Sequence, residues 1–149
     1  MKVLCTGHRG FVGSETVKLL EQDGHEVIGY DIMEHHDIRD VKQLEECVMA
    51  TKPDRILHLA AIARFAEADK DPKLAFETNA VGTLNVARVA AKYHIPIVYA
   101  STGSCYMPIK GIPPITEEFP VMGNSVYGCS KALGEIYIKE AKPFIILRY

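Results

Sequence analysis

Short apolar runs alternate with amphipathic helical segments along this chain, and that alternation restricts its fold more than any other feature. The runs predicted to be strands are Lys2–Thr6, Glu26–Tyr30, a very short one near His35–Ile38, Arg55–Leu59, Ile95–Ser101 and Phe144–Arg148. Helices are predicted over Phe11–Asp23, from an N-cap at Asp40, from Asp71-Pro72 to about Tyr93, and over Ser125–Ala141. Strands separated by helices pair in parallel beneath helices on both faces. The order therefore predicts one α/β domain over residues 1–149 with a doubly wound Rossmann-type parallel sheet.

The glycine-rich turn after the first predicted strand is the first candidate binding element. Gly7 permits a tight turn, Gly10 lets a pyrophosphate approach the backbone, and Gly13 allows the following helix to pack closely. The N-terminus of that helix supplies free N–H groups and partial positive charge. An ordinary strand-to-helix turn is the alternative, but the position between a strand and a helix favours phosphate binding.

An acidic residue, Asp31, ends the second predicted strand 18 residues after Gly13. A carboxylate there can accept hydrogen bonds from the hydroxyls of an adenosine ribose, and it would repel a 2′-phosphate. No arginine follows it directly, so NAD is favoured over NADP. The alternative is a solvated acid at the end of a strand.

Tyr127 and Lys131 form a candidate catalytic pair because a spacing of four places both on one face of a helix. A nearby ammonium favours the phenolate, as do a helix N-terminus and a positively charged nicotinamide ring. Such a tyrosine can take a hydroxyl proton while a hydride leaves the same carbon. Thr102, at the end of the preceding strand, could donate a hydrogen bond to the same substrate oxygen. Taken alone, the pair could also be a solvated helix face.

Composition and charge exclude several classes of function. Lys and Arg total 17 against 19 Asp and Glu, so nothing indicates nucleic acid or an anionic membrane as the main partner. No apolar run approaches the ~20 residues that span a bilayer, and the first residues lack the apolar core of a signal peptide. The four cysteines are scattered, which indicates reduced thiols in a cytoplasmic protein and no zinc site.

Several motifs, in order, resemble those of the extended short-chain dehydrogenase/reductases, the NAD-dependent epimerase/dehydratase family. They are TGHRGFVG at residues 6–13, Asp31, Asp37-Ile38-Arg39-Asp40, His58-Leu59-Ala60-Ala61, Asn79-Ala80-Val81-Gly82-Thr83, Ser101-Thr102, YGCSK at residues 127–131, and Leu147-Arg148-Tyr149. Most of these motifs are weak individually. Their order and spacing make the resemblance specific, and it runs through nearly the whole chain.

The resemblance implies an NAD site built from most of these motifs. The pyrophosphate would be held by Gly7, Gly10, Phe11, Val12 and Gly13. Asp31 would hold the adenosine ribose, and the adenine would be flanked by Asp37 and Ile38. The cofactor cleft would be lined by Leu59, Ala60 and Ala61, with Asn79 beside the cofactor and fixing the active-site helix.

The resemblance also implies a catalytic triad of Thr102, Tyr127 and Lys131. Tyr127 would be the acid/base, and Lys131 would also bind the nicotinamide ribose. Tyr149 falls where the family often has an aromatic residue beside the cofactor. The implied activity is that of an NAD-dependent epimerase or oxidoreductase, with a nucleotide sugar as the substrate.

The chain departs from the family pattern in four places. Dehydratases of the family carry acidic residues after the Thr102 position, where this chain has Gly103-Ser104-Cys105, so epimerisation or simple oxidation and reduction is favoured over dehydration. The connection from Asp31 to Asp37 is short, which predicts one missing crossover helix, and the helix after Lys131 looks trimmed. The carboxyl-terminal lobe that binds the sugar nucleotide is absent, and Phe144–Tyr149 would form an open edge strand.

Three hypotheses follow from this combination. The chain is an NAD-dependent enzyme on nucleotide sugars, either as a fragment of a longer enzyme or as a short form that needs a partner chain to complete its site. Alternatively, it is a binding module that holds NAD without turnover, or a scaffold with a vestigial NAD site. A homodimer through the helices at Pro72–Tyr93 and Ser125–Ala141 is plausible by the resemblance alone.

Overall fold

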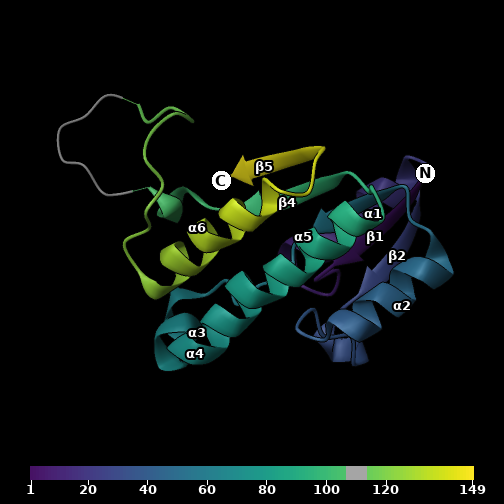
Figure 1. The fold of residues 1–149 in the computed structure, drawn as a ribbon, viewed down its shortest axis with the longest axis horizontal. Coiled ribbons are helices and arrows are strands. Elements are labelled where there is room, and N and C mark those ends of the chain that lie inside the picture. Colours follow the sequence, from purple (N-terminus) through teal and green to yellow (C-terminus); the bar gives the residue numbers. More distant parts are fainter. Residues whose placement is uncertain (107–113) are drawn as a thin grey trace.

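A five-stranded parallel sheet forms the centre of the molecule (Figure 1). The computed structural model describes residues 1–106 and 114–149. The strands are β1 (Lys2–Thr6), β2 (Glu26–Tyr30), β3 (Arg55–His58), β4 (Ile97–Ser101) and β5 (Phe144–Arg148), in the order β2-β1-β3-β4-β5. The predicted α/β class and Rossmann-type sheet are confirmed, and β5 lies at an edge of the described sheet.

One face of the sheet carries most of the apolar core. The parallel register aligns Leu4, Ile28, Ile56, Ile97 and Phe144 across all five strands, so their side chains share a face. Three helices cover this face: α2 (Val41–Thr51), α5 (Thr83–Lys92) and α6 (Val126–Ile138). Their buried side chains join those of the strands in one cluster.

The helix α1 (Phe11–Gln22) packs against β1 and β2 on the opposite face. The connection from β1 to β2 runs in the opposite direction to the later connections, so right-handed crossovers place α1 opposite the other helices. The strand order reverses between β1 and β3, and in such sheets a ligand binds at that point, outside the carboxyl ends of the strands.

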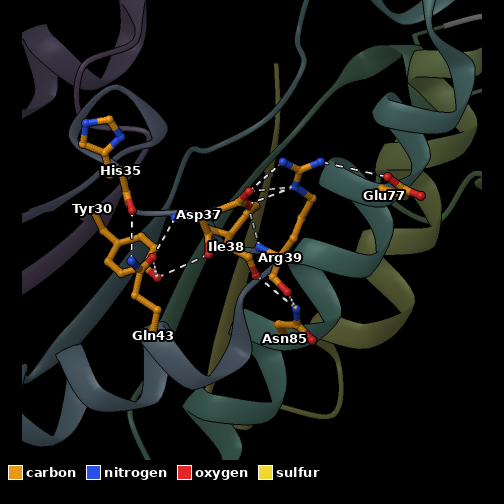
Figure 2. Close-up of polar contacts among 8 residues, drawn as sticks. All are labelled: Tyr30, His35, Asp37, Ile38, Arg39, Gln43, Glu77 and Asn85. Atoms are coloured by element: carbon orange, nitrogen blue, oxygen red, sulfur yellow. Dashed lines mark hydrogen bonds and ion pairs between the residues drawn. The ribbon is translucent and has the colours of Figure 1, made fainter.

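The predicted short strand near His35–Ile38 is wrong. The chain leaves β2 through a 3-10 turn, η1 (Ile32–Glu34), and His35 then adopts a left-handed φ of 62°. Figure 2 shows why no neighbouring strand is needed, because side chains satisfy this backbone. The Gln43 amide binds the carbonyl of His35 and the N–H of Asp37, and Asn85 donates to the carbonyl of Ile38. A single helix, α2, therefore connects β2 to β3, as the short connection predicted.

Two helical features escaped the sequence analysis. A short helix, α3 (Phe65–Lys70), lies where a loop was expected, and α4 (Pro72–Phe76) follows it. The predicted helix from Pro72 contains a π-helical segment, η2 (Glu77–Gly82), before α5 begins. After β4, a 3-10 turn, η3 (Gly103–Cys105), leads away from the sheet. The helix α6 ends at Ile138, three residues before the predicted end.

The described residues also bear on membrane-spanning helices and on disulfide bonds. Within residues 1–106 and 114–149, no helix is long and apolar enough to cross a bilayer. Cys5, Cys47, Cys105 and Cys129 form no disulfide bonds in the described structure.

Candidate functional site

The glycine turn is pressed against the chain that leaves β3. Gly7 has a φ of +72°, and its N–H donates to the carbonyl of Tyr30 at 2.9 Å. A Cβ atom on Gly7 would lie 2.6 Å from the backbone nitrogen of Ala60. Only glycine therefore combines this backbone conformation with this close approach.

The N-terminus of α1 is open to a ligand. Its N-cap is Gly10, no side chain caps it, and its first turn holds no acidic residue. The backbone N–H groups of Phe11 and Val12 thus keep their capacity for an anion. Phe11 is 93% exposed. A Cβ atom on Gly13 would lie 2.2 Å from the carbonyl oxygen of Gly7, so this glycine brings the helix against the turn itself.

Asp31 is held rigidly beside this turn. One carboxylate oxygen accepts a hydrogen bond from the N–H of Met33 at 3.0 Å, and the other accepts one from the N–H of Arg9 at 3.0 Å. The residue is only 7% exposed. Both bonds fix the carboxylate at the end of β2, where the sequence predicted a contact with a ribose.

A cavity of about 380 Å³ lies between the glycine turn and the segment that follows β2. Eight of the predicted cofactor residues line it: Gly7, Gly10, Asp31, Asp37, Ile38, Leu59, Ala60 and Ala61. The other predicted site residues lie outside its lining in the described part of the chain: Phe11, Val12, Gly13, Asn79, Thr102, Tyr127 and Lys131. The cavity is thus lined by the residues predicted for the adenosine and by two of the five predicted for the pyrophosphate.

Asp37 lines this cavity but uses its carboxylate within the chain (Figure 2). The guanidinium of Arg39 donates to both of its oxygens, and Arg39 also lies 3.9 Å from Glu77. The hydrogen bonds from Arg39 hold the pKa of Asp37 below its ordinary value, despite some opposing desolvation.

Asn79 connects the loop after β3 to α6. Its amide oxygen accepts from the N–H of Ile62 at 2.8 Å, and its amide nitrogen donates to the Ile62 carbonyl and the Ser130 hydroxyl, each at 3.0 Å. Asn79 is fully buried on η2, and Ser130 lies on α6. The side chain thereby fixes α6 to the loop after β3.

Tyr127 and Thr102 come together at the start of α6. Burial raises the pKa of the Tyr127 phenol above its ordinary value, and a side-chain interaction with Thr102 opposes that rise. Lys131, which the sequence suggested would lower this pKa, is not among the groups that shift it. The helical spacing of Tyr127 and Lys131 therefore does not by itself produce a phenolate at neutral pH.

Lys131 is almost completely buried, at 2% exposure. Its Nζ lies 4.1 Å from the centroid of the Tyr99 ring, a cation–π contact. Burial lowers the pKa of the ammonium to about 7, although Cys105 and Glu135 favour the charged form. A bound anionic or polar group near this nitrogen would therefore change the fraction of Lys131 that is charged at neutral pH.

Three features of the site were missed by the sequence analysis, and two of them are aromatic rings. Phe65, at the start of α3, packs edge-on against the Tyr127 ring with centroids 5.3 Å apart. His58 joins the hydroxyls of Thr6 and Thr83, at 2.6 and 2.9 Å, and burial drives its pKa well below the ordinary value. The only sequence signal for Phe65 was its position after a strand. The only signal for His58 was its place in the family-like motif at residues 58–61.

The third missed feature is a buried ion pair between α6 and β5. Arg148 on β5 donates to both carboxylate oxygens of Glu135 on α6, at 2.8 and 2.7 Å, and the Ser101 hydroxyl donates to the same carboxylate. Glu135 is four residues after Lys131, so the helical spacing could have indicated it. No cluster of metal-binding side chains occurs among the residues that the structure describes.

Comparisons with known proteins identify the family and the fold of the chain. The family model of the NAD dependent epimerase/dehydratase family matches residues 3–149. The UDP-glucose 4-epimerase of Rhizobium meliloti is 30% identical over 99% of this chain and 50% of its own length. The UDP-glucose 4-epimerase of Thermus thermophilus, solved in complex with NAD, has a TM-score of 0.91 at 30% identity, covering 100% of this chain and 55% of that chain.

A third similar protein is the dTDP-4-dehydrorhamnose reductase of Bacillus anthracis, solved in complex with NADP. Its TM-score is 0.88 at 29% identity, covering 99% of this chain and 52% of that chain. The chain thus spans about half the length of the relatives it matches. The fold is a Rossmann-type α/β fold with a parallel sheet. The chain belongs to the NAD dependent epimerase/dehydratase family.

Proposed function

We propose that this chain binds NAD in the cavity beside the glycine turn and carries the catalytic residues of an epimerase or oxidoreductase of nucleotide sugars. The observation that carries the proposal is the position of the cavity, between the uncapped N-terminus of α1 and the fixed carboxylate of Asp31. A pyrophosphate can bind at the N-terminus of α1, and a ribose hydroxyl can donate a hydrogen bond to Asp31. A cytoplasmic location and a homodimer belong to the same proposal.

The proposed chemistry is a paired transfer of hydride and proton. When bound, the NAD would supply the acceptor for a hydride from the substrate carbon. Tyr127 takes the proton from the hydroxyl on that carbon, and Thr102 donates a hydrogen bond to the same oxygen. The ammonium of Lys131, one helical turn after Tyr127, would favour the phenolate form of Tyr127. Asn79 holds the helix that carries Tyr127 and Lys131.

The segment after Thr102 favours epimerisation or simple oxidation and reduction over dehydration. Gly103-Ser104-Cys105 forms η3, with Thr102 capping its first turn by accepting from the N–H of Ser104 at 3.2 Å. None of these three residues carries a carboxylate that could assist elimination of water.

A second candidate is an NAD-binding chain that does not turn over alone and needs a partner chain for activity. The observation that favours it is the Tyr127 phenol, whose pKa is raised by burial and not lowered. The two candidates share the cofactor site and differ in activity of the isolated chain.

Calorimetry with NAD tests the shared part of the proposal. We expect the purified chain to bind NAD, and Asp31→Ala to weaken binding at least tenfold, because the mutant loses an acceptor for the ribose, equivalent to about 1.4 kcal/mol. Asp69→Ala, an exposed aspartate outside the cavity lining, is the matched control and should bind like the wild type. Absence of NAD binding by the wild-type chain would overturn the proposal.

Turnover separates the two candidates. Cofactor reduction or product formation should be measured with UDP-, GDP- and dTDP-sugars, and Tyr127→Phe should remove the activity while keeping NAD affinity. Activity that survives in Tyr127→Phe contradicts the assigned acid/base. NAD binding without turnover of any of these sugars favours the second candidate.

A further inference from the structure

Two arginines line the proposed cofactor cavity, and each is held by an acidic side chain of the same chain. Arg39 is bound by Asp37 on the segment after β2 (Figure 2). Arg9 lies within the glycine turn, and its Nε donates to the Glu34 carboxylate at 2.8 Å. Its terminal nitrogen donates to the same oxygen. Neither cation is therefore free for an anionic ligand in this arrangement.

Glu34 is placed to hold the basic part of the glycine turn. It ends η1, the turn that begins directly after Asp31, and Asp31 in turn accepts a hydrogen bond from the backbone N–H of Arg9. Glu34 also lies 3.4 Å from Nε2 of His8. The His8 ring packs over Gly29, where a Cβ atom would lie 2.4 Å from it. Glu34 therefore contacts two side chains of the glycine turn, those of His8 and Arg9.

The charge of Glu34 is secure at neutral pH. The hydrogen bond from Arg9 is the largest cause that lowers the pKa of this carboxyl, and the nearby His8, Arg9 and His36 side chains lower it further. Asp31 lines the cavity, and Glu34 lies outside its lining but pairs with Arg9, which lines it. The chain therefore presents two carboxylates and an already paired arginine at this end of the cavity.

A ribose 2′-phosphate would bring a charge of roughly −1.5 to −2 to this place. Arginine is the side chain best suited to bind it, through paired charge-assisted hydrogen bonds. Binding would require Arg9 to leave Glu34, and the phosphate would then lie beside an unpaired carboxylate. A 2′-hydroxyl does not require Arg9 to leave Glu34. The local charges therefore distinguish the two nicotinamide dinucleotides.

We propose that Glu34 is a specificity-determining residue: by holding Arg9, it excludes a 2′-phosphate and makes the chain select NAD over NADP. This inference rests on the proposed function, since it requires a dinucleotide in the cavity. It assigns part of the selectivity to a residue outside the glycine motif and separate from Asp31. Removal of the Glu34 charge converts Arg9 into a ligand for the 2′-phosphate.

The test is calorimetry of NAD and NADP on the 149-residue chain and its Glu34→Gln variant. We expect the wild type to prefer NAD, and Glu34→Gln to narrow the ratio of the two dissociation constants at least tenfold, mainly by tighter binding of NADP. The gained NADP affinity should fall as salt is raised, because it depends on exposed charges. NAD affinity should stay within about twofold, which also shows that the variant is folded.

Two further variants identify the cause. Glu45→Gln changes the net charge equally and breaks an ion pair of similar exposure, that of Glu45 with Lys92 at 2.7 Å, outside the cavity lining. Glu45→Gln should leave the ratio of the NAD and NADP dissociation constants unchanged. Adding Arg9→Met to Glu34→Gln should remove the gained NADP affinity, because the phosphate ligand is lost.

The outcomes separate the two proposals. Wild-type binding of NAD with an unchanged ratio in Glu34→Gln overturns the role of Glu34 and leaves the proposed function standing. A gain in NADP affinity that survives Arg9→Met, or that Glu45→Gln reproduces, overturns it as well. Failure of the wild-type chain to bind either dinucleotide overturns the proposed function itself.

Discussion

Two glycines with the same backbone conformation have different reasons to be glycine. Gly7 and Gly24 have φ angles of +72° and +77°, but only Gly7 has neighbours where a Cβ atom would lie. Gly24→Ala should cost about 1 kcal/mol of unfolding free energy, which is the cost of the left-handed conformation. Gly7→Ala should cost at least about 2 kcal/mol more, because it also overlaps the Ala60 backbone. Urea unfolding measures both, and equal losses would contradict the close approach.

The buried ammonium of Lys131 makes stability depend on pH. Its pKa is about 7 in the folded chain and near 10.5 in the unfolded chain, so between these values the unfolded chain binds more protons and wild-type stability rises with pH. We expect Lys131→Met to be the more stable protein at pH 7. Its advantage should shrink by up to about 1.4 kcal/mol for each pH unit toward 10.

Urea unfolding of wild type and Lys131→Met at several values from pH 7 to pH 10 measures this difference. Comparing the two proteins at each pH cancels the titration of all other groups that both retain. An advantage that is constant with pH would show that Lys131 keeps its charge in the folded chain.

Much of the candidate site could be predicted at the scale of residues. The glycines, Asp31 and the Tyr127–Lys131 pair follow from local spacing along a turn, a strand end or a helix. The hold of Glu34 on Arg9 could not be predicted, because the two residues are 25 apart and meet only through the packing of η1 on the glycine turn. The depressed pKa of Lys131 could not be predicted either, since desolvation is a property of the packed interior.

The ion pair of Glu135 and Arg148 joins α6 to the edge strand β5. Both side chains are largely buried, at 2% and 15% exposure, so removal of one partner leaves an uncompensated charge. Arg148→Met should therefore cost about 3 kcal/mol or more of unfolding free energy. Glu135→Leu combined with Arg148→Met should cost less than the sum of the single changes, because neither charge remains.

A double-mutant cycle in urea measures this coupling. Although burial would raise the pKa of Glu135, the hydrogen bonds from Arg148 and Ser101 lower it overall. A carboxyl with a lowered pKa contributes stability above its unfolded pKa, near 4.5, and loses that contribution as the pH falls. The coupling should therefore be smaller at pH 3 than at pH 7. Additive single effects at pH 7 would contradict the pair.

Elements were predicted well where an apolar pattern is long enough and poorly where side chains replace regular pairing. All five observed strands coincide with apolar runs. The segment at His35–Ile38 has a similar pattern, but amide side chains of Gln43 and Asn85 satisfy its backbone in place of a neighbouring strand. The helix α3 was missed because it has six residues and no side-chain N-cap. Both outcomes depend on contacts between distant segments.

For the whole molecule, the order of elements along the chain was sufficient to predict a parallel sheet with crossover helices. The right-handed crossover rule leaves few arrangements for such an alternation. The position of the cavity followed from the reversal of strand order between β1 and β3. The volume and lining of the cavity did not follow, because they depend on how the segment after β2 folds back over the sheet.

The central position of β1 has a consequence for how the chain folds. β1 is the first of the five strands to be synthesised and is bordered by β2 and β3, while β4 and β5 add beyond β3 one after the other. Each new strand therefore joins an edge that is already in place, in the order in which the ribosome delivers it. No strand has to be inserted between two that are already paired. The sheet can grow outward from its first five-residue strand while the rest of the chain is still being made.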